Sequence, residues 1–315
     1  MPEPEGYLSG TVYAPKHADL IPLVRILNYL ENTRVTNGMP DLGSPLLRIP
    51  MIAEIDVWNR GDGPPPPEPE LASLLAKSEG GYSAELERYA VDHGISYWSC
   101  KLSFYGPPKA NQANWEFAKE KFSTIPGAKF VDNESYKLPL TPEEREKVHK
   151  PQFGIPSLAM FSIGARSRTN PDPTNGHMWF SPIIPRTGEA IFEANRVFNQ
   201  AAKKYGLPVL AFSLPSCYWE RSFIFIFAFP VTRDKETNQK NRAAFRQLVQ
   251  IAAEHGWGEY RTAPAYQDLI MNTYSYNNHA LLRFHETLKD TVDPNGILSA
   301  GRYGIWPKHL RKTEA

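Results

Sequence analysis

Apolar residues recur every three or four positions along several parts of this chain, which is the spacing of one buried face of a helix. The first such run predicts a helix over residues 19–31, with Asp19 as its N-cap. Its apolar positions are Leu20, Leu23, Val24, Leu27 and Leu30. The same reasoning predicts helices over residues 71–77, 111–122, 188–206, 238–256, 265–271 and 280–291. Gly206 and Gly256 are expected to end two of them.

Aromatic and alternating apolar runs between these helices indicate strands. They cover residues 95–106, 128–132, 177–184, 208–214 and 221–231. Two strand–helix–strand units and additional strands predict the α+β class, with helices on one face of a sheet. Residues 61–70, GDGPPPPEPE, cannot form a regular helix or a central strand, so we expect an extended surface connector there.

Composition and charge narrow the range of partners and locations. The 315 residues carry a formal net charge of +1, so no global field attracts nucleic acid or an anionic membrane. The longest apolar run, residues 223–231, is about half as long as a membrane span. Cys100 and Cys217 have no CxxC spacing, which favours a reducing compartment. The amino terminus lacks the pattern of a secretory signal, and we expect a cytoplasmic protein.

The stretch HGWGEYRTAPAYQD, residues 255–268, places a phenol and a guanidinium side by side at Tyr260 and Arg261. On an irregular segment this pair offers a hydroxyl and a fixed cationic fork, which suit an oxygen anion such as a phenolate or a carboxylate. Charge-assisted contacts of this kind favour the ionised form of a bound phenol. The alternative is a buried tyrosine beside a surface arginine.

His177 is a second candidate, because it begins an aromatic strand directly after an Asn-Gly turn, where a ring nitrogen could face a cofactor. The alternative is a strand-end histidine satisfied by the backbone. No second histidine or carboxylate has metal-ligand spacing to His177, so we expect no metal site.

A third candidate is the turn-rich stretch VDPNGILSAGRYGIWP, residues 292–307, which surrounds Arg302. Its backbone amides can approach a ligand, although a plain carboxy-terminal wrap is the alternative. The glycines have the spacing of neither a dinucleotide fingerprint nor a P-loop. From Trp257 onward the pattern changes to a glycine-bounded turn, two helical runs and a turn-rich stretch. We therefore expect this tail to dock as an element separate from the sheet.

The motifs GHMWFSP, WGEYRT and DPNGILSAGRYGIWP, in that order, resemble the carboxy-terminal half of the vanillyl-alcohol oxidase, eugenol oxidase and 4-cresol dehydrogenase family of FAD-linked oxidases. FYGPP near residue 104 and FSTIPGAKF at residues 122–130 extend the resemblance over nearly the whole chain. The resemblance implies oxidation of 4-alkylphenols by hydride transfer from the benzylic carbon to FAD, through a quinone methide. It also implies reoxidation by oxygen or an electron-acceptor protein, and a homo-oligomer when complete.

The same resemblance implies a role for each candidate residue. His177 matches the histidine that the oxidase members bond covalently to the 8α-methyl group of FAD, whereas the cresol dehydrogenases attach the flavin through a tyrosine elsewhere. Tyr260 and Arg261 match the pair that binds the substrate phenolate, and Arg261 also lies near the flavin pyrimidine. Arg302 matches a basic residue on the flavin side of the closing loop.

The family pattern implies three segments in this chain. Residues 1–13 are expected to be the last piece of a PCMH-type FAD-binding domain, residues 14–256 a cap domain with a largely antiparallel sheet, and residues 257–315 a segment that returns to the FAD-binding domain. The amino-terminal half of that domain is absent from this sequence, which leaves apolar faces uncovered. A truncated gene model, an amino-terminal partner chain and a relic without flavin are the options. The rival function is a non-catalytic cap-like domain that binds a partner or a small aromatic molecule.

Overall fold

The largest sheet has five strands in the order β4-β1-β3-β2-β7, and every neighbouring pair in it is antiparallel. The computed structural model describes residues 4–47, 69–148, 150–156, 176–207, 214–215 and 221–311. The strands are β1 (Gly6–Ala14), β2 (Asp41–Gly43), β3 (Trp98–Tyr105), β4 (Lys129–Lys137) and β7 (Leu214–Pro215). The predicted α+β class with a largely antiparallel sheet is confirmed.

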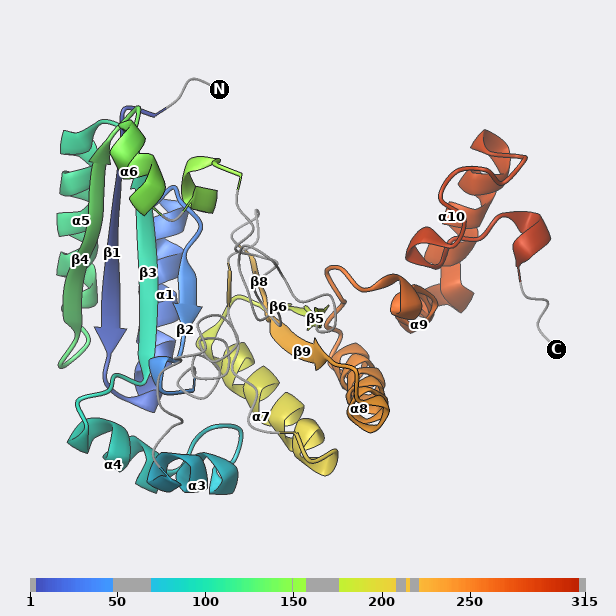
Figure 1. Ribbon diagram of the computed structural model, residues 1–315, viewed down its shortest axis with the longest axis horizontal. Coiled ribbons are helices and arrows are strands. Elements are labelled where there is room, and N and C mark those ends of the chain that lie inside the picture. Colours follow the sequence, from blue (N-terminus) through green and yellow to red (C-terminus); the bar gives the residue numbers. More distant parts are fainter. Residues whose placement is uncertain are drawn as a thin grey trace.

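Helices α1 (Leu20–Asn32) and α5 (Pro108–Phe122) lie together on one face of this sheet (Figure 1). All five apolar positions predicted for α1 are buried, because they share the side of the helix that meets the strands. The Trp115 ring of α5 lies against Gly10 of β1, where any side chain would collide with it. The short helix α6 (Pro142–Lys147) and a 3₁₀ turn, Lys150–Phe153, follow β4.

Asp19 lies at the predicted N-cap position of α1, but its side chain does not cap this helix. A 3₁₀ turn, His17–Asp19, runs directly into the helix, so Asp19 already has the helical dihedrals φ −66° and ψ −12°. Its carboxylate turns back and accepts a hydrogen bond from Lys16 N–H at 2.8 Å. Asp19 therefore caps the preceding turn and makes no side-chain cap on α1.

Two helices precede β3 in the chain. The first, α3 (Pro69–Lys77), agrees with the predicted helix at residues 71–77. The second, α4 (Ala84–Asp92), was not predicted, although Ser83 caps it by accepting a hydrogen bond from Leu86 N–H. Residues 61–68 of the predicted proline-rich connector lie outside the described residues.

Two further strand pairs include or adjoin the GHMWFSP motif. In one, β5 (Gly176–Phe180) pairs with β9 (Phe227–Val231), and in the other β6 (Ile183–Pro185) pairs with β8 (Ser222–Ile224). Each of the strands predicted at 177–184 and 221–231 is therefore split in two. Pro182, which lacks an N–H, accounts for the break between β5 and β6. Most of the strand predicted at residues 208–214 lies outside the described residues.

Helices α7 (Gly188–Lys204) and α8 (Lys235–Glu254) pack beside these strand pairs (Figure 1). An aromatic cluster fills the space between helices and strands, and its members are Phe180, Phe198, Phe227, Phe229 and Phe245. Gly206 and Gly256 follow the two helices with φ of +69° and +72°. Their predicted role as helix stops is confirmed, because residues with a Cβ rarely adopt this conformation.

The carboxy-terminal elements lie beyond β9 and α8, at the far end of the molecule from the five-stranded sheet (Figure 1). They are α9 (Gln267–Thr273), α10 (Tyr276–Val292) and two 3₁₀ turns, Arg302–Gly304 and Lys308–Leu310. No residue of α10 is buried. Apolar side chains stay exposed along it and after it, namely Leu281, Phe284, Leu288, Val292, Ile297 and Leu298. The expectation that this tail leaves apolar surface uncovered therefore agrees with the structure.

The expected boundary between residues 13 and 14 falls inside β1. This strand pairs with β3 over residues 7–14 and with β4 over residues 6–13, so both of its edges are bonded to the sheet. No structural division separates residues 6–13 from residues 98–137. The assignment of residues 14–256 to a cap domain and of residues 257–315 to a FAD-binding domain stays a prediction.

Candidate functional site

The motifs GHMWFSP and WGEYRT, about eighty residues apart in the sequence, are bonded to each other through their main chains. Ile183 N–H donates to the Gly258 carbonyl at 2.7 Å, and Tyr260 N–H donates to the Ser181 carbonyl at 2.9 Å. Between these two bonds, Glu259 forms an antiparallel bridge with Pro182. The segment 258–260 thus continues the sheet at the point where β5 ends and β6 begins.

His177 lies on the strand that leads into this bridge. It pairs with Pro230 in the β5–β9 ladder, four residues before Ser181. At about 3.3 Å per residue, this places its backbone about 13 Å along the strand from the bridge. The direction of its imidazole lies outside the described part of the structure. The backbones of His177 and of the Tyr260–Arg261 pair therefore belong to one connected sheet region.

Tyr260 and Arg261 both face solvent. Tyr260 keeps 41% of its surface exposed, and the Arg261 guanidinium lies 5.8 Å from the centre of the Tyr260 ring. Among the described residues, Arg261 makes no ion pair, so its charge is not neutralised by a neighbouring carboxylate. The interpretation of Tyr260 as a buried tyrosine is wrong, because the residue is among the exposed large apolar side chains.

Glu259 is a residue that sequence reasoning missed. Its Oε1 accepts a hydrogen bond from the N–H of Ser181, a residue only 1% exposed, at 2.7 Å. Its Oε2 is shielded from solvent and has no hydrogen-bond partner among the described residues. Burial raises the pKa of Glu259 to about 8, while the bond from Ser181 N–H acts in the opposite direction. A carboxylate inside the WGEYRT motif was the available signal, but its partner is 78 residues away.

Tyr274, at the end of α9, closes the other side of this segment. A side chain at Gly258 would meet the Tyr274 hydroxyl at 2.6 Å, so the phenol would have to shift to make room for it. Burial, and to a smaller extent the nearby Glu259, raises the pKa of Tyr274. Glu259 and Tyr274 therefore lie close together, and burial favours the neutral form of each.

Arg302 is exposed on the turn Arg302–Gly304, with its guanidinium 5.0 Å from the Tyr303 ring. This turn packs on α9: Tyr303 N–H donates to Gln267 Oε1 at 2.8 Å, and Trp306 Nε1–H donates to Asp268 Oδ1 at 2.8 Å. Because α9 follows Arg261 closely in the chain, Arg302 lies on an element bonded to the continuation of the WGEYRT motif. No hydrogen bond or ion pair among the described residues joins Arg302 to Tyr260 or Arg261.

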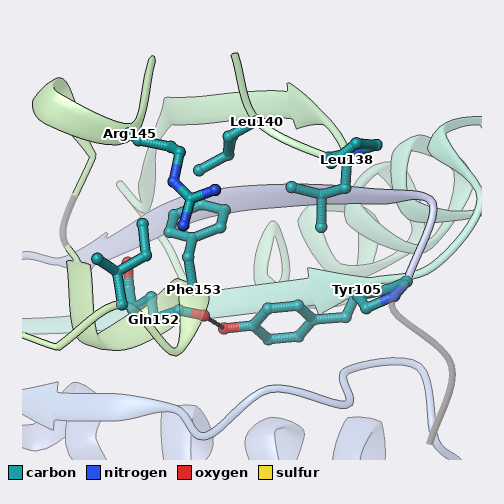
Figure 2. Close-up of a pocket in the computed structure, with 9 residues that line it drawn as sticks. Tyr105, Leu138, Leu140, Arg145, Gln152 and Phe153 are labelled. Carbon is teal, nitrogen blue, oxygen red and sulfur yellow. Dashed lines mark hydrogen bonds between the residues drawn. The ribbon is translucent and has the colours of Figure 1, made fainter. Parts of the chain in front are cut away.

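A cavity of about 240 Å³ lies elsewhere, between β3, the Leu138–Leu140 segment and the turn Lys150–Phe153 (Figure 2). Arg145 points into it beside Phe153, and the Tyr105 hydroxyl donates to the Gln152 carbonyl at 3.0 Å. None of the residues predicted for the site lines this cavity.

Two other ionisable side chains, the partly buried His17 and the buried Cys100, are packed within the fold. His17 is stacked between the rings of Tyr82 and Phe192, at 4.0 and 4.3 Å, and burial lowers its pKa to about 4. Cys100 is buried in β3, and burial raises the pKa of its thiol. In the described ranges, no three His, Cys, Asp or Glu side chains gather closely enough to hold a metal ion. The helices described here include none with the length and apolar character needed to cross a membrane.

Comparisons with known proteins give relatives but no family model that matches. The flavoprotein subunit of 4-cresol dehydrogenase (hydroxylating) from Pseudomonas putida is 22% identical over 309 residues, which are 97% of this chain and 53% of that protein. The solved structure of 4-ethylphenol oxidase from Gulosibacter chungangensis, in complex with isoeugenol, has a TM-score of 0.74 and 25% identity over 99% of this chain and 56% of its own.

A second solved structure, p-cresol methylhydroxylase with substrate bound, has a TM-score of 0.69 and 20% identity over 97% of this chain and 54% of its own. The chain thus spans about half the length of the relatives that it matches. Together the sequence and the fold show that this chain is a relative of the alkylphenol-oxidising flavoproteins and has the mixed helix and antiparallel-sheet fold of their carboxy-terminal portion.

Proposed function

We propose that this chain takes part in the flavin-dependent oxidation of 4-alkylphenols, with Tyr260 and Arg261 holding the phenolate oxygen of the substrate. The observation that carries this proposal is the bonding of residues 258–260 to residues 181–183, which joins the Tyr260–Arg261 segment to the strand of His177. The names of the relatives, a 4-cresol dehydrogenase subunit and a 4-ethylphenol oxidase, support this class of substrate.

The chemistry of the pair agrees with this task. Loss of a hydride from the benzylic carbon is easier when the phenol is ionised, because a neutral quinone methide is then formed. A fixed guanidinium and a phenolic O–H lower the energy of the phenolate oxygen, and one well-placed donor is commonly worth about 3 kcal/mol in a transition state. Arg261 suits this role because no carboxylate among the described residues neutralises it.

FAD is the cofactor that we propose, and the chemistry it supplies when bound is acceptance of the hydride. The exposed guanidinium groups of Arg261 and Arg302 would suit the negative charge that a flavin ring gains on accepting a hydride. We propose that His177 bonds covalently to the 8α-methyl group, as the oxidase-type resemblance implies. In this proposal residues 14–256 form the cap over the ring, and residues 257–315 return to a FAD-binding domain.

We further propose that the adenine, ribose and pyrophosphate of FAD are held by a FAD-binding half outside this sequence. The relatives are nearly twice as long as this chain, which supports that arrangement. Oxygen or an electron-acceptor protein then reoxidises the flavin, and the complete enzyme is a cytoplasmic homo-oligomer. The rival function, a cap-like domain that binds a small aromatic molecule without flavin, makes a different prediction for the experiment below.

The test produces this chain together with the FAD-binding half of a relative, adds FAD, and titrates the purified combined protein with 4-ethylphenol. Ionisation of the phenol on binding gives an ultraviolet difference spectrum, and retention of FAD after gel filtration is measured by visible absorption. Covalent attachment through His177 predicts that the yellow colour stays with the acid-precipitated protein. A colourless precipitate of the combined protein argues against that linkage, and a combined protein that holds the phenol but retains no FAD favours the rival function.

The substitution Arg261→Ala is expected to weaken phenolate binding by at least about tenfold, because a charge-assisted hydrogen bond is lost. Retention of FAD is expected to change much less. The matched control is Arg88→Ala, which removes an exposed arginine from α4. Equal losses of phenol and flavin binding in Arg261→Ala would make this residue part of the cofactor site and contradict its assignment to the substrate.

A further inference from the structure

We propose that Glu259 is a positioning residue, whose carboxyl group ties the strand of His177 to the Tyr260–Arg261 segment through the N–H of Ser181. Its side chain makes the hydrogen bond from Oε1 to that N–H at 2.7 Å. This side-chain hydrogen bond links the two motifs directly. The catalytic part of this inference rests on the proposed function, whereas the structural part does not.

The need for this bond follows from the main chain at the end of β5. Ser181 is only 1% exposed, so its N–H cannot be satisfied by bulk water. Pro182, the next residue, has no N–H, and the regular ladder is interrupted there. Glu259 supplies the acceptor that a neighbouring strand would otherwise give. Both polar main-chain groups of Ser181 are thus held by adjacent residues, Glu259 and Tyr260.

The protonation state of Glu259 bears on the charge of the site. A carboxylate two residues from Arg261 would compete with a phenolate for the guanidinium and would repel the phenolate. The groups that face Glu259 are the Ser181 N–H and the hydroxyl of Tyr274, the residue after α9, while the exposed Tyr260 and Arg261 follow it on its own segment. Because burial favours the neutral acid, Glu259 accepts a hydrogen bond from Ser181 and leaves the positive charge of Arg261 available.

Two substitutions separate the hydrogen bond from the ionisable proton. Glu259→Gln keeps an oxygen that accepts from Ser181 N–H but cannot ionise, whereas Glu259→Ala removes the acceptor. The matched control is Glu254→Gln, at an exposed glutamate at the end of α8. The first measurement is amide hydrogen exchange of the full chain without flavin or substrate, followed at Ser181 and at Tyr260.

Loss of one buried hydrogen bond predicts about tenfold faster exchange at Ser181 in Glu259→Ala, with Glu259→Gln and the control close to the original chain. Equal exchange in Glu259→Ala and the original chain would overturn the positioning role. Global unfolding of Glu259→Ala would show itself as faster exchange in the five-stranded sheet as well. In that case Glu259→Gln decides, because rescue of Ser181 exchange by the glutamine supports the role and its failure overturns it.

The second measurement is the pH dependence of 4-ethylphenol binding. In the original chain, binding is expected to weaken relative to Glu259→Gln as the pH rises above about 8, because the fraction of neutral carboxyl then falls about tenfold per unit. Parallel profiles for the two proteins would overturn the electrostatic part of the inference. If neither protein binds the phenol, the proposed function fails, while the exchange experiment still decides whether Glu259 positions the two motifs.

Discussion

At the scale of single residues, burial sets the charge of Glu259. In the unfolded chain its carboxyl has an ordinary pKa of 4.5, whereas burial raises the pKa to about 8 in the folded chain. Between these values the folded protein holds a proton that the unfolded chain releases. Raising the pH therefore favours unfolding in this window, and the neutral carboxyl stabilises the fold fully only below about pH 4.5.

This linkage predicts a difference between the original chain and Glu259→Gln. From pH 4.5 to pH 8, the free energy of unfolding of the original chain is expected to fall relative to that of the variant, by roughly 1 kcal/mol per pH unit. Urea denaturation at a series of pH values measures it. A constant difference across the window would mean that Glu259 titrates in the folded protein as it does in water.

Residues of this kind limit what sequence analysis can find. Tyr260 and Arg261 attracted attention because their side chains are chemically distinctive and adjacent. Glu259, their direct neighbour, owes its properties to a contact with Ser181, 78 residues away. Asp19 shows the converse case. Its sequence position suits a side-chain cap on α1, but its carboxylate is already bonded within the preceding 3₁₀ turn.

At the scale of elements, the turn Arg302–Gly304 depends on close packing against α9. Gly304 has φ of +75°, and a Cβ placed on it would lie 2.7 Å from the Met271 Cβ. The turn can approach the helix only because this residue has no side chain. The position of Arg302 therefore depends on a glycine two residues away.

Gly304→Ala is expected to loosen this turn from α9. Overpacking of this kind costs about 1–3 kcal/mol, and the strained φ adds to it. Trp306, which donates to Asp268, reports the change through its fluorescence and through exposure to a quencher. Gly94→Ala is the matched control, since Gly94 has φ of +66° but open space around it. Equal effects of the two substitutions would attribute the loss to backbone strain alone.

Helices with a long apolar period, such as α1, α5, α7 and α8, could be predicted because burial of one face dominates their stability. Strand boundaries were harder to predict from the sequence, because they depend on which strands pair with each other. The predicted strand at 177–184 splits at Pro182, and β1 extends across the expected boundary at residue 13 because β3 and β4 pair with both its edges. The short helix α4 was missed despite its Ser83 cap.

At the scale of the whole molecule, apolar side chains are distributed unevenly. The sheet and its helices bury theirs, whereas α10 buries none and leaves Phe284 at 60% and Val292 at 72% exposed. Contiguous exposed apolar surface of this type is unusual on a soluble monomer. The far end of the molecule is therefore where the free chain is expected to meet apolar probes.

A dye that fluoresces in apolar surroundings is expected to bind the purified chain at α10. Phe284→Ser together with Leu288→Ser should lower its fluorescence at least about twofold, because these side chains contribute much of the exposed patch. Met39→Ser, which removes another exposed apolar residue, is the control and should leave the signal nearly unchanged. Unchanged fluorescence in the double variant would place the apolar surface elsewhere.

The bridge between residues 258–260 and 181–183 uses main-chain atoms on both sides. The route of the polypeptide at residues 260 and 261 consequently does not rest on the side chains of these two residues, although Glu259 adds its own bond to Ser181. A library of substitutions at positions 260 and 261 should therefore alter ligand preference while the path of the backbone is retained. Evolution and protein engineering have the same freedom here, since new recognition can arise at these two positions without rebuilding the surrounding strands.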